Sequence, residues 1–285
     1  MRDRVTPAVT GAALLMGALL LVSCAQGERA PGRTAGPAGG APAAHRAERL
    51  RVEVLEVLAH DPAAFTEGLE MAGRTLYEGT GLSGGSWVQA GPPGRRPTAR
   101  VALPGPLFGE GITVLGRTLW QLTWRDRIAV ERDTATLKEL RRVRYPDEGW
   151  GMCFQQDRHR LVTSDGSARL TFRDPGTLAA KGGVSVTEDG APLERLNELE
   201  CVGAAVYANV FDTDRIVRID PATGAVTADI DASGLMRGAA LAPGAVLNGI
   251  AAVPGTDQFL VTGKFWPRMF RVTFAPALGT GGSGG

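Results

Sequence analysis

The segment FGEGITVLGRTLWQLTW, residues 108–124, recurs in modified form at four other places in the chain. Each copy has a polar opening, a short apolar run, a tight turn that contains Gly or Asp in most copies, and a second run rich in Leu, Val, Tyr or Trp. Consecutive copies begin 39 to 51 residues apart. The other four are FTEGLEMAGRTLYEGTG (65–81), DEGWGMCFQQDRHRLVTSDG (147–166), LNELECVGAAVYANVFDTD (196–214) and LNGIAAVPGTDQFLVTGK (247–264). Strand pairs repeated at this spacing predict an all-β fold, a five-bladed β-propeller with one copy in each blade.

The sequence between the copies supplies the outer strands of each blade. A third strand and a fourth strand follow the pair, for instance at Arg127 to Arg132 and Leu137 to Tyr145. The last copy is followed by only one strand, Met269 to Phe274, whereas Leu50 to Leu58 is an extra strand before the first copy. We expect this N-terminal strand to close the ring as the outer strand of the last blade, because it would hide an open sheet edge.

Composition excludes several classes of protein. Of 285 residues, 39 are Gly and 18 are Pro, which argues against a helical bundle, and the 44% hydrophobic content excludes wholesale disorder. A net charge of +1 provides no basic field for nucleic acid. Three His and three Cys without CxxC or HxxxH spacing leave little for a transition-metal site, so we expect no cofactor. A structural calcium ion stays open, because clustered carboxylates suit a hard cation.

Both ends of the chain differ from the middle. Residues 1–23 have a positive start and an apolar run, and Leu21-Val22-Ser23-Cys24 resembles a bacterial lipobox. We therefore expect a lipoprotein signal peptide, a lipid on Cys24, and a membrane-anchored protein facing outside the cytoplasm; the alternative is an ordinary secretory signal. Residues 24–49 are predicted to be a flexible Pro/Gly/Ala-rich tether and residues 275–285 a disordered Gly-rich tail, which leaves 50–274 as the propeller domain.

Aligning the copies brings polar residues to one place in the predicted ring. The position that opens the first strand is Glu67, Glu110, Glu148, Asn197 and Asn248 in the five copies. We expect these side chains to meet at one end of the central channel. Carboxylates in a narrow mouth raise one another's pKa through desolvation and like charge, which suits a general acid. The alternative for any one of them is a structural role, capping a strand or tying neighbouring blades.

The ends of the second strands lead to the same mouth. Trp124, Asp165, Asn209 and Lys264 occupy those positions. Aromatic residues near the polar ring predict a small apolar pocket; they are Phe65, Phe108, Trp124, Trp150 and Phe211. Trp266 is expected to pack between blades instead.

A series of short motifs, spread in order over nearly the whole of residues 50–274, is the basis of a resemblance to a known family. The motifs are His60-Asp61-Pro62, Phe65-Thr66-Glu67-Gly68, Phe108-Gly109-Glu110-Gly111, Leu122-Thr123-Trp124, Glu148-Gly149-Trp150-Gly151, Ser164-Asp165-Gly166, Asn197-Glu198-Leu199-Glu200, Ala208-Asn209-Val210, Leu247-Asn248-Gly249-Ile250 and Thr262-Gly263-Lys264. This series resembles the plant and bacterial type of glutaminyl-peptide cyclotransferase.

The resemblance implies an enzyme that converts an N-terminal glutamine of a peptide or protein into pyroglutamate and releases ammonia. It implies that Glu110 is the catalytic acid/base, and that the substrate is bound by Phe65, Glu67, Phe108, Trp124, Trp150, Asn197 and Lys264. Two residues depart from the family pattern, which often has Gln at Glu67 and Trp at Phe211. We expect a monomer.

Other interpretations stay open at this point. One is a non-catalytic, lipid-anchored propeller that binds a partner, and another is a calcium-dependent hydrolase of the lactonase kind. Cys153 and Cys201 lie near the ends of two first strands, and we expect two buried free thiols in preference to a disulfide.

Overall fold

The computed structural model describes residues 46–277, and this part of the chain consists mainly of β-strands. Its one helix is a single 3-10 turn, η1 (Gln156–Arg158). The strands are β1 (Glu48–Ala59), β2 (Thr66–Ala72), β3 (Thr75–Thr80), β4 (Trp87–Gly91), β5 (Ala99–Ala102), β6 (Gly109–Leu115), β7 (Thr118–Thr123), β8 (Ile128–Asp133), β9 (Glu139–Arg144), β10 (Met152–Gln155), β11 (Arg160–Thr163), β12 (Arg169–Arg173), β13 (Ala180–Ser185), β14 (Thr187–Glu188), β15 (Ala191–Pro192), β16 (Leu196–Val202), β17 (Ala205–Val210), β18 (Arg215–Ile219), β19 (Val226–Asp231), β20 (Leu247–Ala252), β21 (Phe259–Gly263) and β22 (Arg268–Pro276). The predicted all-β class is confirmed.

Hydrogen bonding joins these strands into several sheets, and within most of them the strands are in chain order. Strands β2–β5, β6–β9 and β10–β13 form three four-stranded antiparallel sheets, and β14–β15 is a short hairpin. An eight-stranded sheet has the order β16-β17-β18-β19-β1-β22-β21-β20. It consists of two antiparallel halves, which are joined because the first residues of β1, Glu48 to Arg51, pair in parallel with β19. The repeat pattern does not predict this parallel joint.

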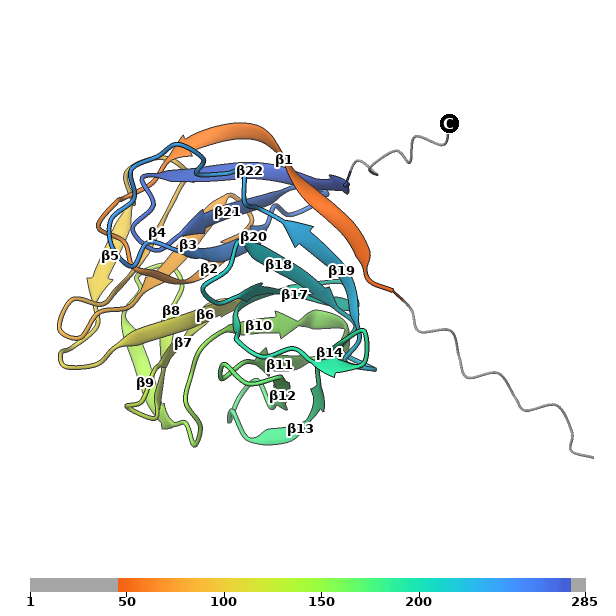
Figure 1. Ribbon diagram of the computed structural model, residues 1–285. Coiled ribbons are helices and arrows are strands. Elements are labelled where there is room, and N and C mark those ends of the chain that lie inside the picture. The colour runs from red at the N-terminus through yellow and green to blue at the C-terminus, as the bar shows by residue number, and fades with distance from the viewer. Residues whose placement is uncertain (1–45, 278–285) are drawn as a thin grey trace, which may run out of the picture. The chain divides into compact units, whose positions relative to one another are not determined.

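The repeated segments form the hairpins β2–β3, β6–β7, β10–β11, β16–β17 and β20–β21. Figure 1 shows β2, β6, β10 and β20 toward the middle of the fold, and β5, β9, β13 and β19 toward its periphery. Two of the hairpin turns contain Gly73 and Gly116, each with φ of 60°. A side chain is strained in that left-handed conformation, so glycine is favoured there.

The first strands of the hairpins contact one another in a closed cycle, β2 with β6, β6 with β10, β10 with β16, β16 with β20, and β20 with β2. Glycines allow this close approach. A Cβ on Gly111 would lie 2.5 Å from the Trp150 carbonyl oxygen, and one on Gly151 would lie 2.1 Å from that of Asn197. The Gly111 amide instead donates a 2.7 Å hydrogen bond to Trp150 O. The polar residues beside these glycines are thereby drawn together.

The apolar core lies between neighbouring sheets. One buried cluster joins Val88 of β4 to Leu119 of β7, and another joins Leu122 of β7 to Leu161 of β11. Burial of this apolar surface provides the main driving force that holds the sheets together.

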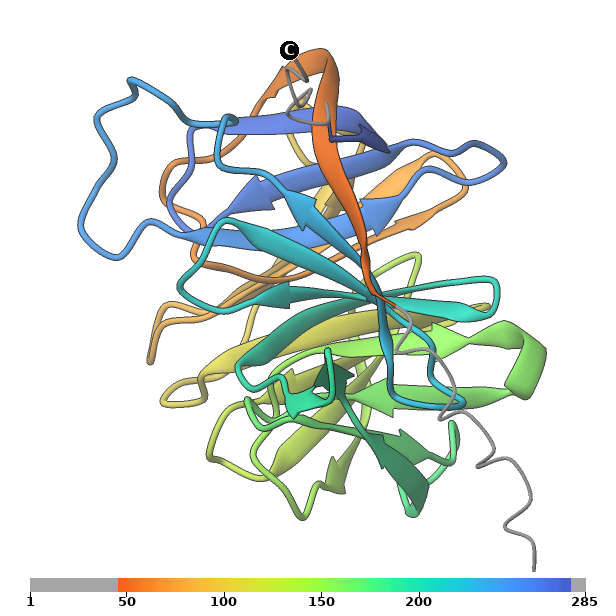
Figure 2. The ribbon, with the colours of Figure 1, turned by 45° about the vertical axis from the view of Figure 1, so that its right-hand side comes forward.

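The N-terminal strand β1 pairs antiparallel with β22, from Leu50 opposite Pro276 to Ala59 opposite Arg268. This pairing agrees with the expectation that the extra strand joins the C-terminal strands. Leu50 is buried, whereas Leu55 is 51% exposed at a bulge. Figure 2 shows β1 leading from β19 over to β22.

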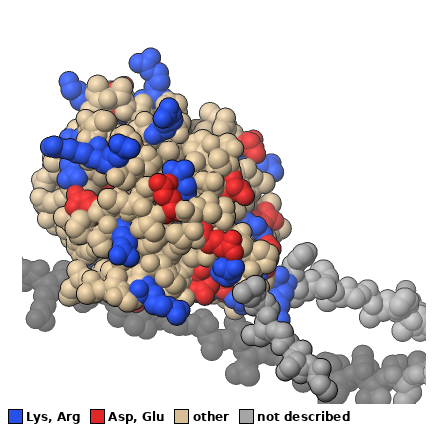
Figure 3. Space-filling model, turned by 90° about the horizontal axis from the view of Figure 1, so that it is seen from above, with Lys and Arg blue, Asp and Glu red and all other residues tan. Residues whose placement is uncertain are grey.

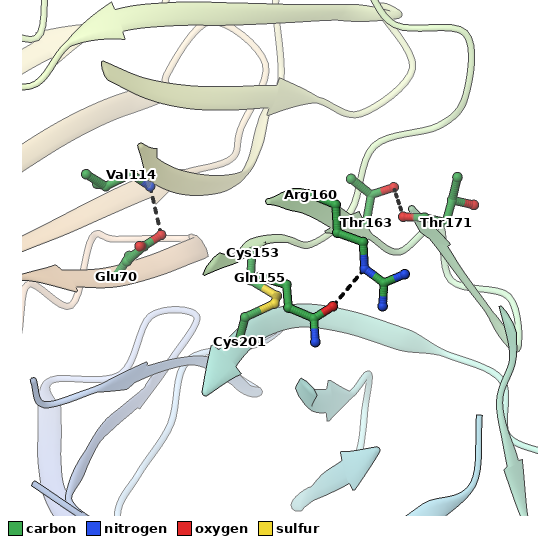
Figure 4. The surroundings of a disulfide bond; sticks show 8 residues. All are labelled: Glu70, Val114, Cys153, Gln155, Arg160, Thr163, Thr171 and Cys201. Carbon is green, nitrogen blue, oxygen red and sulfur yellow. Dashed lines mark hydrogen bonds between the residues drawn. A yellow bond between two sulfur atoms is a disulfide. The ribbon is translucent and has the colours of Figure 1, made fainter. Parts of the chain in front are cut away.

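A disulfide joins Cys153 of β10 to Cys201 of β16, so the expectation of two free thiols was wrong (Figure 4). The two cysteines are 48 residues apart in sequence, but their strands are neighbours, and the Cα atoms lie 5.4 Å apart. That separation is within the range that a disulfide spans. The same view shows the Glu70 carboxylate of β2 accepting a 2.9 Å hydrogen bond from the Val114 amide of β6.

On the surface, acidic and basic side chains both occur on the face shown in Figure 3, where many of them are adjacent. Ion pairs within the described part of the chain include Arg271 with Glu56 at 3.2 Å. The mixture agrees with the net charge of +1.

Candidate active site

One pocket of about 310 Å³ brings together all eight of the site residues predicted from the sequence, and Phe211 with them. The lining residues are Phe65, Glu67, Phe108, Glu110, Trp124, Trp150, Asn197, Phe211 and Lys264.

Hairpin geometry explains why these residues meet. Three of them are each the second residue of a first strand, Glu67 in β2, Glu110 in β6 and Asn197 in β16. Three others directly follow a second strand, Trp124 after β7, Phe211 after β17 and Lys264 after β21. In an antiparallel hairpin the end of the second strand lies beside the start of the first. Phe211 was predicted as an aromatic residue of the pocket but not as a substrate-binding residue, and its position directly after a second strand is shared with Trp124 and Lys264.

Aromatic rings form the walls of the pocket. Phe108 lies between Phe65 and Trp124, with ring centroids 6.1 and 5.5 Å away, and Trp150 meets Phe211 edge to face at 5.6 Å. These rings keep water from the polar groups between them, and an unpaired charge is therefore costly there.

Glu148 lies behind the aromatic walls and does not line the pocket. Its Oε1 accepts hydrogen bonds from the indole N–H groups of Trp124 at 2.5 Å and Trp150 at 3.2 Å. Its Oε2 lies 3.5 Å from Nε of Arg125, and its side chain is 36% exposed. Glu148 thus lies at the same end of the fold as Glu110, as expected, but its carboxylate orients the two tryptophans and does not line the pocket.

Glu67 and Lys264 form a buried ion pair at the base of the pocket. The Lys264 Nζ lies 2.7 and 2.8 Å from the two carboxylate oxygens of Glu67, and the two side chains are 6% and 2% exposed. Asn248 Nδ2 also donates to Glu67 Oε2, at 3.3 Å, and to Thr66 O, at 2.9 Å. Asn248, the fifth member of the expected ring, thus lies behind Glu67 and outside the pocket lining.

Glu110 is 5% exposed, and it lines the same pocket as Glu67. Burial raises the pKa of Glu110 well above its usual range, the charge of Glu67 raises it further, and the Lys264 ammonium opposes the increase. Burial also raises the pKa of Glu67, to about 7, against the effect of Lys264. The two carboxyl groups therefore hold a proton to higher pH than carboxyl groups in water do.

Asn197 offers a free acceptor to this pocket. Its Oδ1 is buried and has no hydrogen-bond partner within residues 46–277. A buried amide oxygen without a partner is costly, and a donor on a bound molecule would remove that cost.

Two other residues expected at the mouth do not line the pocket. Asn209 is fully buried, and its Oδ1 accepts a 3.0 Å hydrogen bond from the Gly249 amide, which holds the start of β20. Asp165 accepts from the Ser167 amide at 3.1 Å and stabilises a turn. Trp266 packs edge to face against Phe270 in the core, as expected.

Other carboxyl groups lie deeper along the first strands. Glu198 accepts hydrogen bonds from the amides of Leu69 and Ile250 at 3.2 and 2.9 Å, and so ties β16 to β2 and β20. Burial raises the pKa values of Glu198 and Glu200 well above the usual range. In the described part of the chain, no three His, Cys, Asp or Glu side chains are gathered so as to hold a metal ion.

A pocket with aromatic walls that encloses a buried carboxyl group of raised pKa is typical of an enzyme that binds a small chemical group. A family model described as glutamine cyclotransferase matches residues 19–274. The chain belongs to the glutamine cyclotransferase family.

Two relatives place the chain within that family. It is 35% identical over 245 residues to the glutaminyl-peptide cyclotransferase of Arabidopsis thaliana, a match that covers 81% of this chain and 74% of the relative. It is similar to the crystal structure of Myxococcus xanthus glutaminyl cyclase, with a TM-score of 0.77 and 35% identity over 82% of this chain and 100% of that chain.

Proposed function

We propose that this protein is a glutaminyl-peptide cyclotransferase, which converts the N-terminal glutamine of a peptide or protein into pyroglutamate with release of ammonia. Membership of the glutamine cyclotransferase family and the activity for which both relatives are named support this function. The observation in this molecule that supports it best is Glu110, a carboxyl group whose pKa burial raises well above its usual range inside an aromatic pocket of about 310 Å³.

The chemistry requires one proton carrier. The α-amine of the substrate attacks the side-chain amide carbon, and the amide nitrogen must be protonated before it leaves as ammonia. Ring closure is intramolecular, so positioning contributes more than activation of the amine. In our proposal Glu110 gives its proton to the departing nitrogen and receives one from the attacking amine. Asn197 accepts a hydrogen bond from the bound glutamine, and the aromatic walls hold it.

We also propose that the antiparallel sets form a five-bladed β-propeller, with β1 as the outer strand of the last blade. The closed cycle of first strands and the pairing of β1 with β22 support this arrangement. The pocket would then lie at one mouth of the central channel.

The activity is tested by incubating the protein with a dipeptide that begins with glutamine and measuring the ammonia released. We expect release from this dipeptide, and none from the same dipeptide acetylated on its α-amine or from one that begins with asparagine, which would need a four-membered ring. We expect phenanthroline to leave the rate unchanged. Absence of ammonia from the free glutamine dipeptide would refute the proposed function.

The lipid anchor is a separate proposal, because Cys24 lies outside the described residues. It rests on the pattern Leu21-Val22-Ser23-Cys24. In residues 46–277 no helix is long and apolar enough to cross a membrane. Replacing Cys24 by Ser should move the protein from the membrane fraction to the soluble fraction in the cells that express it, as measured by immunoblotting. Membrane association that survives the substitution would exclude this anchor.

A further inference from the structure

The carboxyl groups of Glu67 and Glu110 differ sharply in how many partners they have. Both carboxylate oxygens of Glu67 accept hydrogen bonds from Lys264 Nζ, at 2.7 and 2.8 Å. One of them also accepts a hydrogen bond from Asn248 Nδ2, at 3.3 Å. Glu110 is buried in the same pocket, and within the described part of the chain its carboxyl group has no hydrogen bond from a Lys, Asn or backbone donor. Donors stabilise an ionised carboxylate, so the negative charge belongs on Glu67. Two buried carboxyl groups in one small pocket disfavour a second negative charge, so the proton that is retained belongs on Glu110, which lacks the donors that Glu67 has.

We propose that Glu67 and Glu110 work as a proton-sharing pair, in which Lys264 keeps Glu67 ionised and Glu67 positions the proton that Glu110 transfers. This inference rests on the proposed cyclotransferase function and assigns Glu67 a positioning role within it. Glu67 does not itself exchange protons with the substrate.

The charges around the pair favour this arrangement. Glu110 faces Glu67, Lys264 and, more weakly, Glu148, and Glu67 faces Lys264 and Asn248. With Lys264 charged, Glu67 ionised and Glu110 protonated, the dry base of the pocket is neutral. Ionising Glu110 as well would leave an uncompensated negative charge there, at a high cost in free energy.

The proton balance of ring closure then sets the pH dependence. The bond from the α-amine nitrogen to the amide carbon forms, the bond from that carbon to the departing nitrogen breaks, and one proton passes from the amine through Glu110 to ammonia. Below the pKa of the pair, Glu110 and the α-ammonium both hold protons, which is one proton too many for reaction. Once the pair has lost this proton, the Glu110 carboxylate takes the proton of the α-ammonium and passes it to the departing nitrogen. We therefore expect the pKa of the pair to define the acidic limb of kcat/KM.

Glu67→Gln provides the test, because it keeps the size of the side chain while it removes the negative charge. The amide can also donate a hydrogen bond to an ionised Glu110. The lost charge and the new donor both favour ionisation of Glu110. We expect the acidic limb of kcat/KM to move to lower pH by about one to three pH units. Glu67→Asp keeps the charge and should leave the limb near its original position. Glu148→Gln is the matched control, because it removes a nearby charge that has no hydrogen bond to Glu110, and it should shift the limb much less.

A readout independent of turnover separates this proposal from the proposed function. The carbonyl stretch of a protonated carboxyl group is visible by infrared spectroscopy, and the difference between the original protein and Glu110→Gln isolates the Glu110 signal. We expect this signal at neutral pH, and we expect its titration to move to lower pH in Glu67→Gln. Thermal melting of each variant verifies that it is folded. An unmoved titration in folded Glu67→Gln would refute the pair, whereas a shifted titration in a protein that releases no ammonia would refute only the cyclotransferase function.

Discussion

Replacing Glu110 by Gln should reduce kcat for a glutamine dipeptide by a factor of about 100 or more, and KM should change little. The substitution keeps the size and polarity of a side chain that is 5% exposed, but the amide cannot carry a proton to the departing nitrogen. A hundredfold loss corresponds to about 2.7 kcal/mol in the activation free energy. The measurement is steady-state ammonia release, with circular dichroism to verify the fold.

Other members of the expected carboxylate ring serve as controls for this result. Glu148→Gln should lose less activity, because Glu148 contacts the tryptophan indoles and does not line the pocket. Glu67→Gln should also lose less, because Glu67 positions the proton without transferring it. Near-normal turnover in Glu110→Gln, together with loss of turnover in either control, would reassign the proton carrier.

Deleting residues 48–59, which form β1, should prevent the protein from folding to a soluble form. Strand β1 pairs with β22 along nearly its whole length and with β19 at its start, so the deletion exposes two sheet edges at once. It also removes Leu50 from the cluster that contains Ile230 and Phe270. The combined decrease in the free energy of unfolding is comparable with the whole stability of a typical domain, about 5–15 kcal/mol. Solubility and the far-ultraviolet spectrum of the deletion variant are the measurements.

A graded form of the same experiment compares two leucines of β1. Leu50→Ala should lower the free energy of unfolding by about 2–5 kcal/mol, because it leaves a cavity in the core. Leu55→Ala should change it by less than about 1 kcal/mol, because that side chain is 51% exposed. Urea denaturation measures both. Equal effects, or a deletion variant that folds, would show that β1 does not stabilise the fold as we infer.

The hairpins and most of the pocket could be predicted because they depend on local order along the chain. Each repeated segment folds as one hairpin, and equivalent positions in hairpins packed side by side come to the same end. The repeat alone therefore predicts that Glu67, Glu110, Asn197, Trp124 and Lys264 lie together, as they do in the pocket. Phe211 follows the same logic, since it comes directly after β17.

The orientation of individual side chains could not be predicted in this way. Glu148 holds the equivalent position to Glu110, yet its carboxylate contacts the indoles of Trp124 and Trp150 outside the pocket. Asn248 holds the position as well, and it lies behind Glu67. Rotamers depend on neighbours from other strands, and those neighbours differ from copy to copy.

By itself the sequence determined the all-β class, the five hairpins and the end of the fold at which the polar and aromatic residues gather, since all three follow from a pattern that repeats along the chain. The tertiary structure alone decided the disulfide between Cys153 and Cys201, the parallel joint of β1 with β19, and the ion pair of Glu67 with Lys264. These contacts join residues from 48 to 197 positions apart. The physical reason is that such pairs meet only when whole sheets pack, so distance in space and burial, which no local pattern encodes, select the partners.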